Sequence, residues 1–257
     1  MGERENWLLL RGLAREQRHW GDFPELFESK VPGAKVHCLD LPGVGTEHRR
    51  GSPLTIEGIT RDLRRRWSIL RAEHEGPWSM LAVSLGGMIT MHWGATYQRD
   101  FQSLVVINSS TRGLSGPLER LRVEAIPSLA RAMMEEDPFS REKVILGFTS
   151  RLKERHEEAA RRSAELLKDA PIRRSTALSQ LAAAATFRTP RRIETPMLFL
   201  AGGADGMVDP ICALRLARHF SAPLHVHPTG GHELSLDAPE WIAEQVANWR
   251  GGGRRKG

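Results

Sequence analysis

The segment Trp78-Ser-Met-Leu-Ala82-Val-Ser84-Leu-Gly86-Gly-Met88 predicts the fold of the chain around it. An apolar run ends at Ser84, small residues stand two positions before and after the serine, and a helical stretch follows at once. This pattern is typical of a sharp strand-to-helix turn that presents a serine hydroxyl, because a larger side chain would clash where strand and helix approach closely. The alternative is an ordinary connection in which Ser84 is the N-cap of the helix.

Two later segments end in residues that can activate such a serine. Residues 196–205 and residues 223–232 each form a predicted strand followed by glycines, and they end in Asp205 and His232. Serine is a poor nucleophile at neutral pH and needs an adjacent base, which an acid orients. Both residues follow the carboxyl end of a predicted strand, where open α/β sheets place their chemistry. The order serine, acid, histidine is that of hydrolases built on such a turn.

With these motifs the chain resembles the α/β-hydrolase superfamily over nearly its whole length. Four further segments match motifs of that superfamily: the strand and turn at residues 7–13, the Asp-Leu-Pro-Gly-Val-Gly loop at 40–45, the acid loop at 202–210 and the histidine loop at 231–240. The resemblance implies a mostly parallel central sheet flanked by helices. The turn at Ser84 corresponds to the nucleophile elbow of that superfamily, and the helix after it to the elbow helix. The resemblance also implies a helical cap inserted after the strand that follows this elbow helix.

The resemblance assigns a role to each motif residue. It makes Ser84 the nucleophile, His232 the general base and then acid, and Asp205 the orienting carboxylate. The backbone amides of Leu13 and Leu85 would form the oxyanion hole, where one donor is typically worth about 3–4 kcal/mol of the activation barrier. Chemistry of this kind requires no metal and no cofactor.

Two other residues compete for the role of the acid. Asp209 lies four residues after Asp205, but Asp before Pro is a common helix start, so we interpret Asp209 as the N-cap of a helix beginning at Pro210. Some relatives place the acid after the strand that follows the elbow helix. Here that strand, residues 104–107, ends in Asn108, which carries no charge.

The chain departs from the superfamily pattern at two positions. Ala82 replaces the first glycine of the elbow, and Arg11 replaces the usual histidine of the His-Gly turn. Arg11 puts a permanent cation beside the expected oxyanion hole, which would favour a substrate that carries a carboxylate. The more frequent role of an arginine near a cleft is to pair with a structural carboxylate.

The order of predicted elements divides the chain into a core and an insertion. Strands and helices alternate up to residue 111 and again from residue 191, which is typical of a parallel sheet covered on both faces. Between them only helical segments are predicted, at residues 118–134, 141–153 and 156–168. We therefore predict a core of residues 1–111 and 191–249, a helical cap of residues 112–190, and a disordered basic tail of residues 250–257.

Charge is distributed unevenly along the chain. Residues 112–192 contain 17 Lys and Arg against 11 Asp and Glu, an excess equal to the net charge of +6 of the whole chain. Such mixed sequences are usually the solvated faces of helices with i,i+4 ion pairs. The arginine-rich cap also resembles that of pimeloyl-acyl-carrier-protein methyl ester carboxylesterases, which engage an acidic carrier protein. Such a carrier would meet the cap near Arg155, Arg161 and Arg162.

Composition narrows the class of protein further. No apolar run of the 257 residues approaches the roughly 20 needed to cross a bilayer, and no export signal is visible. The two cysteines, Cys38 and Cys212, fit buried free thiols, so we expect a cytoplasmic protein without a membrane partner. Aromatic residues are not interleaved with the basic ones, which argues against nucleic acid. His225 and His227 lack further ligands at metal-binding spacing, which argues against a metal site.

The favoured interpretation is a serine carboxylesterase that acts on a small-molecule ester. A thioesterase, a lactonase or a carbon–carbon bond hydrolase using the same triad is an alternative. A non-catalytic ligand-binding protein with the same fold is another.

Overall fold

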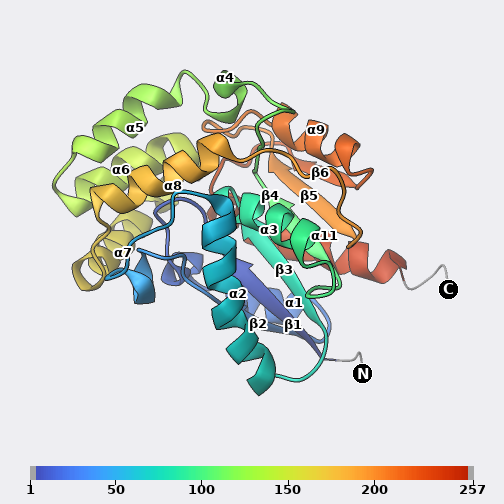
Figure 1. Cartoon of the computed structure of the whole chain (residues 1–257). Coiled ribbons are helices and arrows are strands. Elements are labelled where there is room, and N and C mark those ends of the chain that lie inside the picture. Colours follow the sequence, from blue (N-terminus) through green and yellow to red (C-terminus); the bar gives the residue numbers. More distant parts are fainter. Residues whose placement is uncertain (1–3, 254–257) are drawn as a thin grey trace.

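Six strands form one sheet in the order β2-β1-β3-β4-β5-β6, and every neighbouring pair is parallel (Figure 1). The computed structural model describes residues 4–253. The strands are β1 (Glu5–Leu10), β2 (Ala34–Cys38), β3 (Trp78–Val83), β4 (Leu104–Ile107), β5 (Met197–Gly202) and β6 (Leu224–His227). The mostly parallel sheet predicted from the alternation of strands and helices is therefore confirmed.

Helices cover both faces of the sheet. The helices α1 (Phe23–Lys30), α10 (Leu234–Asp237) and α11 (Pro239–Gly253) pack on one face. The opposite face carries α2 (Ile56–Glu73), α3 (Leu85–Thr96) and α9 (Ile211–His219). Three short 3-10 helices, η1 (Gln17–Trp20), η2 (Gly45–Glu47) and η3 (Lys153–Arg155), lie in connections.

Alternate residues of the central strands belong to different cores. In β1, Leu8 and Leu10 pack toward α2 and α3, whereas Trp7 and Leu9 pack toward α1 and α11. All four side chains are fully buried. A parallel strand buried on both faces reads as a continuous apolar run, which is why these strands are recognisable in the sequence.

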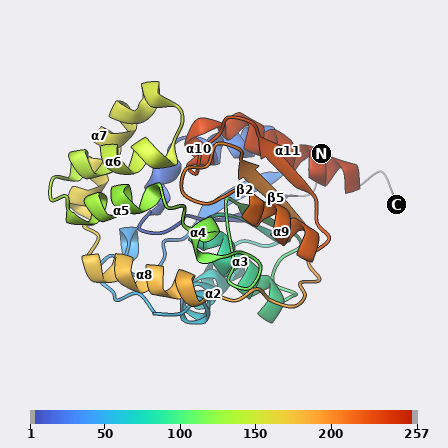
Figure 2. The ribbon, with the colours of Figure 1, turned by 90° about the horizontal axis from the view of Figure 1, so that it is seen from above.

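Between β4 and β5 the chain forms a helical insertion. It contains α4 (Pro117–Arg120), α5 (Ala125–Met134), α6 (Pro138–Thr149), α7 (His156–Asp169) and α8 (Arg174–Thr186). Helices α5 to α8 gather to one side of the sheet, as the two views show (Figures 1 and 2). This insertion corresponds to the segment that the sequence predicts as helical.

The prediction of a single helix at residues 118–134 is wrong, because the structure has two helices there, α4 and α5. Pro127 explains the break. In a continuous helix its ring would clash with the carbonyl of Val123 and it could not donate a backbone hydrogen bond. In the structure Pro127 instead stands in the first turn of α5, where no donor is required.

The C-terminal helix also differs from the expectation. Helix α11 continues to Gly253, whereas an irregular tail is predicted from residue 250. Arg250 donates to both carboxylate oxygens of Glu5, at 3.0 and 2.9 Å, which ties the end of α11 to the start of β1. The rest of the predicted tail, residues 254–257, lies outside the described residues. None of the helices within residues 4–253 is both long and apolar enough to cross a membrane.

Candidate active site

Ser84 occupies a strained turn between β3 and α3. Its backbone φ of 56° and ψ of −115° lie outside the regions that serine ordinarily adopts. The Ser84 amide donates to the carbonyl of Ile107 at 2.8 Å, which anchors the turn to β4. The Ser84 side chain makes no capping bond to α3, so the alternative that this serine is a side-chain N-cap is wrong. Ser84 is half-buried and lines a pocket.

Two glycines allow the first strand to approach this turn. A Cβ on Gly86 would lie 2.7 Å from the carbonyl oxygen of Arg11, and a Cβ on Gly12 would lie 3.1 Å from the Cβ of Ser84. The turn that contains Leu13 is thereby brought against the serine. The amide of Leu85 opens α3 and is among the donors that have no acceptor within the helix. Leu85 follows Ser84 directly in the chain, and Leu13 follows Gly12, whose backbone approaches the Ser84 side chain.

His232 and Asp205 meet beyond the carboxyl ends of β5 and β6. The Nδ1–H group of His232 donates to Asp205 Oδ2 at 2.7 Å, and both side chains are buried. The other carboxylate oxygen accepts from the amides of Met207 and Val208, at 2.7 and 2.9 Å, which fixes its orientation. Because Nδ1 is bonded to Asp205, Nε2 is the ring nitrogen left free to accept a proton.

The surroundings of His232 favour its charged form. Burial by itself lowers the pKa of His232, but the negative charge of Asp205 and the hydrogen bond to it outweigh burial. As a result the pKa of His232 is raised above its ordinary value of 6.5. This shift suits a base that must hold a proton during a reaction and then release it.

The rival carboxylate has a different partner. Asp209 Oδ1 accepts from the amide of Ile211 at 2.9 Å, so Asp209 caps the first turn of α9. The helix itself begins at Ile211, one residue later than predicted, and Pro210 occupies its N-cap position, so the prediction that Asp209 is the N-cap is wrong. Among the described residues, only Asp205 of these two carboxylates has a bond to His232.

Asn108 has a function that the sequence analysis missed. This buried residue follows β4 with a left-handed φ of 49°. Its amide nitrogen donates to the carbonyls of Gly231 and His232, at 3.0 and 2.9 Å, while its oxygen accepts from the amide of Gly202 at 2.8 Å. Asn108 thus holds the histidine loop against the acid strand. Asparagine tolerates a left-handed backbone conformation well. An asparagine directly after a predicted strand was therefore the feature of the sequence that could have indicated this role.

Arg11 pairs with a carboxylate of the protein. Its guanidinium donates to Glu233 Oε2 at 2.5 Å and to Ser235 Oγ at 2.8 Å, and it lies 4.6 Å from the ring centre of Trp20. Arg11 lines the pocket beside Ser84, but its charge is compensated by Glu233. The structural interpretation of Arg11 therefore describes the geometry better than a free site for a substrate carboxylate.

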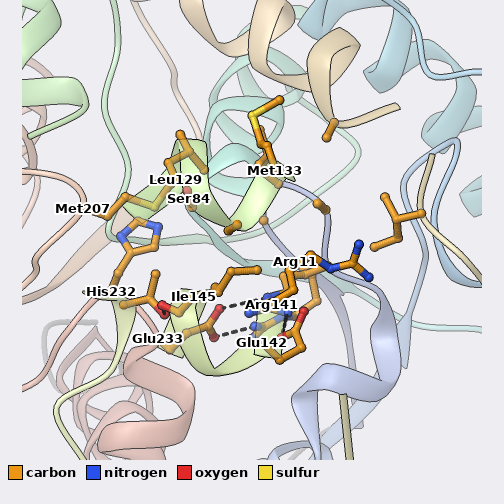
Figure 3. A pocket seen from close by; sticks show the side chains of 18 of the residues that line it. Arg11, Ser84, Leu129, Met133, Arg141, Glu142, Ile145, Met207, His232 and Glu233 are labelled. Atoms are coloured by element: carbon orange, nitrogen blue, oxygen red, sulfur yellow. Dashed lines mark hydrogen bonds and ion pairs between the residues drawn. The ribbon is translucent and has the colours of Figure 1, made fainter. Parts of the chain in front are cut away.

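An apolar pocket of about 130 Å³ connects these groups to the helical insertion (Figure 3). Ser84, His232 and the turn at residues 11–15 line it from the core. The insertion contributes mainly apolar side chains, which are Leu129, Ala132, Met133, Ile145, Phe148, Leu167, Ile172 and Ala177. The pocket can therefore accept a short apolar group next to the serine.

The basic residues of α7 form the ion pairs expected of a solvated helix face. Arg161 pairs with Glu157 at 2.6 Å and Arg162 with Glu158 at 3.5 Å, both at i,i+4 spacing. These side chains are more than half exposed, so each pair contributes little to stability. Exposed arginines nevertheless remain on this side of the molecule.

The cysteines and histidines offer no second reactive centre within residues 4–253. Burial raises the pKa of Cys38 to about 12 and that of Cys212 to about 11, so neither is a thiolate at neutral pH. No three His, Cys, Asp or Glu side chains of this part of the chain are grouped so as to hold a metal ion.

The chain is similar to known proteins in sequence and in fold. A family model described as serine aminopeptidase, S33, matches residues 15–239. A curated relative, the pimeloyl-[acyl-carrier protein] methyl ester esterase of Xanthomonas campestris pv. campestris (strain B100), is 31% identical over 109 residues. That alignment covers 42% of this chain and 38% of the relative, so the chain matches well under half of that protein.

Solved structures match over nearly the whole chain. A hydrolase from Pseudomonas aeruginosa PA01 superposes with a TM-score of 0.78 at 20% identity, covering 96% of this chain and 90% of that one. The enol-lactonase from Burkholderia xenovorans LB400 gives a TM-score of 0.76 at 16% identity, covering 96% and 92%. At these identities the likeness establishes the fold.

Proposed function

This chain belongs to the serine aminopeptidase S33 family of α/β hydrolases, and from that premise we propose that it cleaves carboxylic ester bonds through an acyl-enzyme intermediate. One observation carries the proposal. A half-exposed serine on a strained turn shares an apolar pocket with a buried histidine whose Nδ1 is bonded to an aspartate at 2.7 Å. This is the set of groups that acyl transfer through serine requires.

The proposed reaction has two stages, acylation of Ser84 and hydrolysis of the acyl-enzyme. Ser84 Oγ attacks the ester carbonyl while His232 Nε2 takes the hydroxyl proton, and Asp205 stabilises the resulting imidazolium. The amides of Leu13 and Leu85 donate to the oxyanion of the tetrahedral intermediate. His232 then gives its proton to the departing alcohol. Water, activated by the same histidine, attacks the acyl-enzyme and releases the acid.

The pocket favours a short apolar acyl group. Its lining is largely aliphatic, and its volume of about 130 Å³ is small for a site that would take a long chain. The residues of the insertion close it opposite Ser84, so we propose that residues 112–190 act as a cap that sets acyl-chain preference. Residues 1–111 and 191–249 would then form the catalytic core.

A carrier-bound ester is a second candidate substrate. The partial match to a pimeloyl-[acyl-carrier protein] methyl ester esterase favours it. So do two exposed arginines, Arg173 and Arg174, which line the pocket and have no carboxylate partner among the described residues. An acidic carrier protein would be attracted to such a surface.

A substrate panel compared with the Ser84→Ala variant tests the proposal. It should contain p-nitrophenyl esters of increasing acyl length, a thioester, a lactone and an aminoacyl p-nitroanilide. We expect turnover of short esters by the wild type and a loss of at least about 10⁴-fold in kcat for Ser84→Ala. Ser68→Ala, at an exposed position on α2, is the control and should match the wild type.

Each outcome of the panel has a distinct meaning. Faster turnover of the thioester, lactone or anilide than of every ester would replace the ester assignment while leaving Ser84 as nucleophile. Wild-type activity that survives in Ser84→Ala would contradict the proposed mechanism. Inactivity on all substrates, together with no labelling by a fluorophosphonate, would indicate a non-catalytic binding protein.

A further inference from the structure

A chain of buried ion pairs joins three segments around the pocket (Figure 3). Glu233 Oε2 lies 2.5 Å from Arg11 and Glu233 Oε1 lies 3.5 Å from Arg15. Arg15 in turn donates to Glu142 Oε2 at 2.6 Å. All four residues are at most 8% exposed. These ion pairs therefore run from the histidine loop at residues 231–240, through the turn at residues 11–15 (the proposed oxyanion turn), to helix α6 of the insertion.

The carboxylate of Glu233 holds both ends of the oxyanion turn. Arg11 and Arg15 stand two residues before and two residues after Leu13, and each pairs with a different oxygen of Glu233. Glu233 is itself the neighbour of His232, and its amide donates to the carbonyl of Thr149 in α6 at 2.8 Å. The Glu233 side chain therefore links the residues on both sides of Leu13 to the loop that carries His232.

Stability alone does not account for four buried charges here. Removing charges from water costs several kcal/mol for each ion, and a buried pair often adds no more stability than apolar residues of the same volume. What such a network supplies is a defined geometry. Burial alone raises the pKa of Glu233, but the charges of Arg11 and Arg15 overcome it and lower the pKa to about 2. Glu233 is thus a carboxylate at neutral pH.

The same residues divide two cavities. Arg11, Arg15 and Glu233 line the apolar pocket beside Ser84 and also a second, more polar cavity of about 500 Å³. The second cavity lies between α7 and the segment of the core at residues 18–26. The ion pairs between these residues therefore lie between the two cavities.

We infer that Glu233 is a positioning residue, which sets the Leu13 amide and His232 at the spacing that the transition state requires. We further infer that Glu142 fixes this arrangement to the helical insertion through Arg15. The inference rests on the proposed serine hydrolase function and deepens it. A misplacement of about 1 Å in a reacting group can cost about 100-fold in rate, so the effect should appear in kcat.

Glu233→Gln and Glu5→Gln are a matched pair of variants that test this inference. Glu5 is 7% exposed, accepts from Arg250 and lies at the start of β1, at the amino-terminal edge of the sheet and outside the pocket lining. Both variants replace a buried, arginine-paired carboxylate by an amide. We expect kcat on a short p-nitrophenyl ester to fall about 10- to 100-fold in Glu233→Gln, with KM within about twofold. Glu5→Gln should retain kcat within about twofold.

Glu142→Gln and Arg15→Lys provide a second test that does not depend on Glu233→Gln being folded. Each should lower kcat. In the double variant Glu142→Gln/Glu233→Gln, the fold-loss in kcat should be smaller than the product of the two single losses, because both residues act through Arg15. Circular dichroism and thermal melting of all variants separate a loss of fold from a loss of rate. Arg15→Lys retains a positive charge, so a partial recovery relative to Arg15→Met indicates positioning by charge.

The outcomes separate this inference from the proposed function. If the wild type hydrolyses esters and the folded Glu233→Gln and Glu142→Gln variants keep kcat within about twofold, the inference is overturned and the proposed function stands. An equal loss in Glu5→Gln would also overturn it, since any buried carboxylate would then have the same effect. A wild type that neither hydrolyses esters nor reacts with a fluorophosphonate would remove the proposed function itself.

Discussion

The two walls of the pocket are built in different ways. On the core side, Ser84 and His232 stand on turns that follow β3 and β6, and their positions are fixed by backbone hydrogen bonds and by close approaches of glycines. On the insertion side, helices α5, α6 and α8 contribute apolar side chains, and two buried polar residues, Glu142 and Gln180, reach the oxyanion turn. On the core wall, local backbone geometry positions the residues of the proposed active site, whereas the insertion contacts this wall through segments distant in sequence.

The core wall should be the more sensitive to substitution. His232→Gln removes the only proposed base, so we expect kcat to fall by about 10⁵- to 10⁶-fold with the fold retained. His225→Gln, on an exposed position of β6, is the control and should remain fully active. Ester hydrolysis by purified variants is the measurement. Activity of His232→Gln within about tenfold of the wild type would show that the base is elsewhere.

Asp205→Asn should cause the next largest loss and should also change the pH dependence. In the wild type, kcat/KM should rise with pH through the raised pKa of His232, above 6.5, because only the neutral imidazole accepts the proton. Asp205→Asn removes the main cause of that increase and leaves burial, which lowers the pKa. The inflection should therefore move to lower pH while kcat falls by about 10⁴-fold.

Asp209→Asn is the matched control for the acid. Its side chain caps α9 and has no bond to His232, so a loss of about 1 kcal/mol in stability or less, with kcat unchanged, is expected. A larger loss of kcat in Asp209→Asn than in Asp205→Asn would reverse the assignment of the acid.

Gln180→Ala tests the insertion wall. Gln180 is fully buried in α8, and its Oε1 accepts from the amide of Ala14 at 2.8 Å, beside Leu13. Truncation leaves this amide without a partner, which costs about 1–3 kcal/mol of stability. We expect kcat to fall about tenfold because the oxyanion turn loses one of its supports. Equal kcat in the wild type and Gln180→Ala would confine the role of Gln180 to folding.

The smallest effect on simple esters is expected at the exposed face of the insertion. Reversing Arg155, Arg161 and Arg162 together to Glu should change kcat/KM on p-nitrophenyl esters by less than about twofold. On an ester bound to an acidic carrier protein at low salt, KM should rise about five- to tenfold. Arg61→Glu on α2, which also breaks an exposed i,i+4 pair, is the control. Equal effects on both substrates, or none, would exclude Arg155, Arg161 and Arg162 as the docking face for a carrier protein and leave Arg173 and Arg174 beside the pocket.

The difference between the walls also determines what the sequence could predict. Ser84, Asp205 and His232 could be proposed from the sequence because each stands in a short motif of apolar residues and glycines that is typical of one backbone geometry. The parallel sheet was predicted for the same reason, since β1 and β3 are buried on both faces and read as continuous apolar runs.

Contacts between distant segments left no such signal. Glu142 and Gln180 lie 127 and 166 residues from their partners in the oxyanion turn, and nothing in their immediate surroundings marks them. Asn108 was noted only for lacking a charge, although its left-handed conformation allows its amide to join two loops. The break before α5 could have been predicted, because Pro127 does not fit the interior of a helix.

The site of covalent modification by a fluorophosphonate tests the central claim most directly. The reagent is a substrate-like electrophile that marks a serine activated by a histidine base. Peptide mapping by mass spectrometry should find one adduct, on the peptide containing Ser84, in the wild type and none in Ser84→Ala or His232→Gln. An adduct on another serine, or undiminished modification in His232→Gln, would contradict the account.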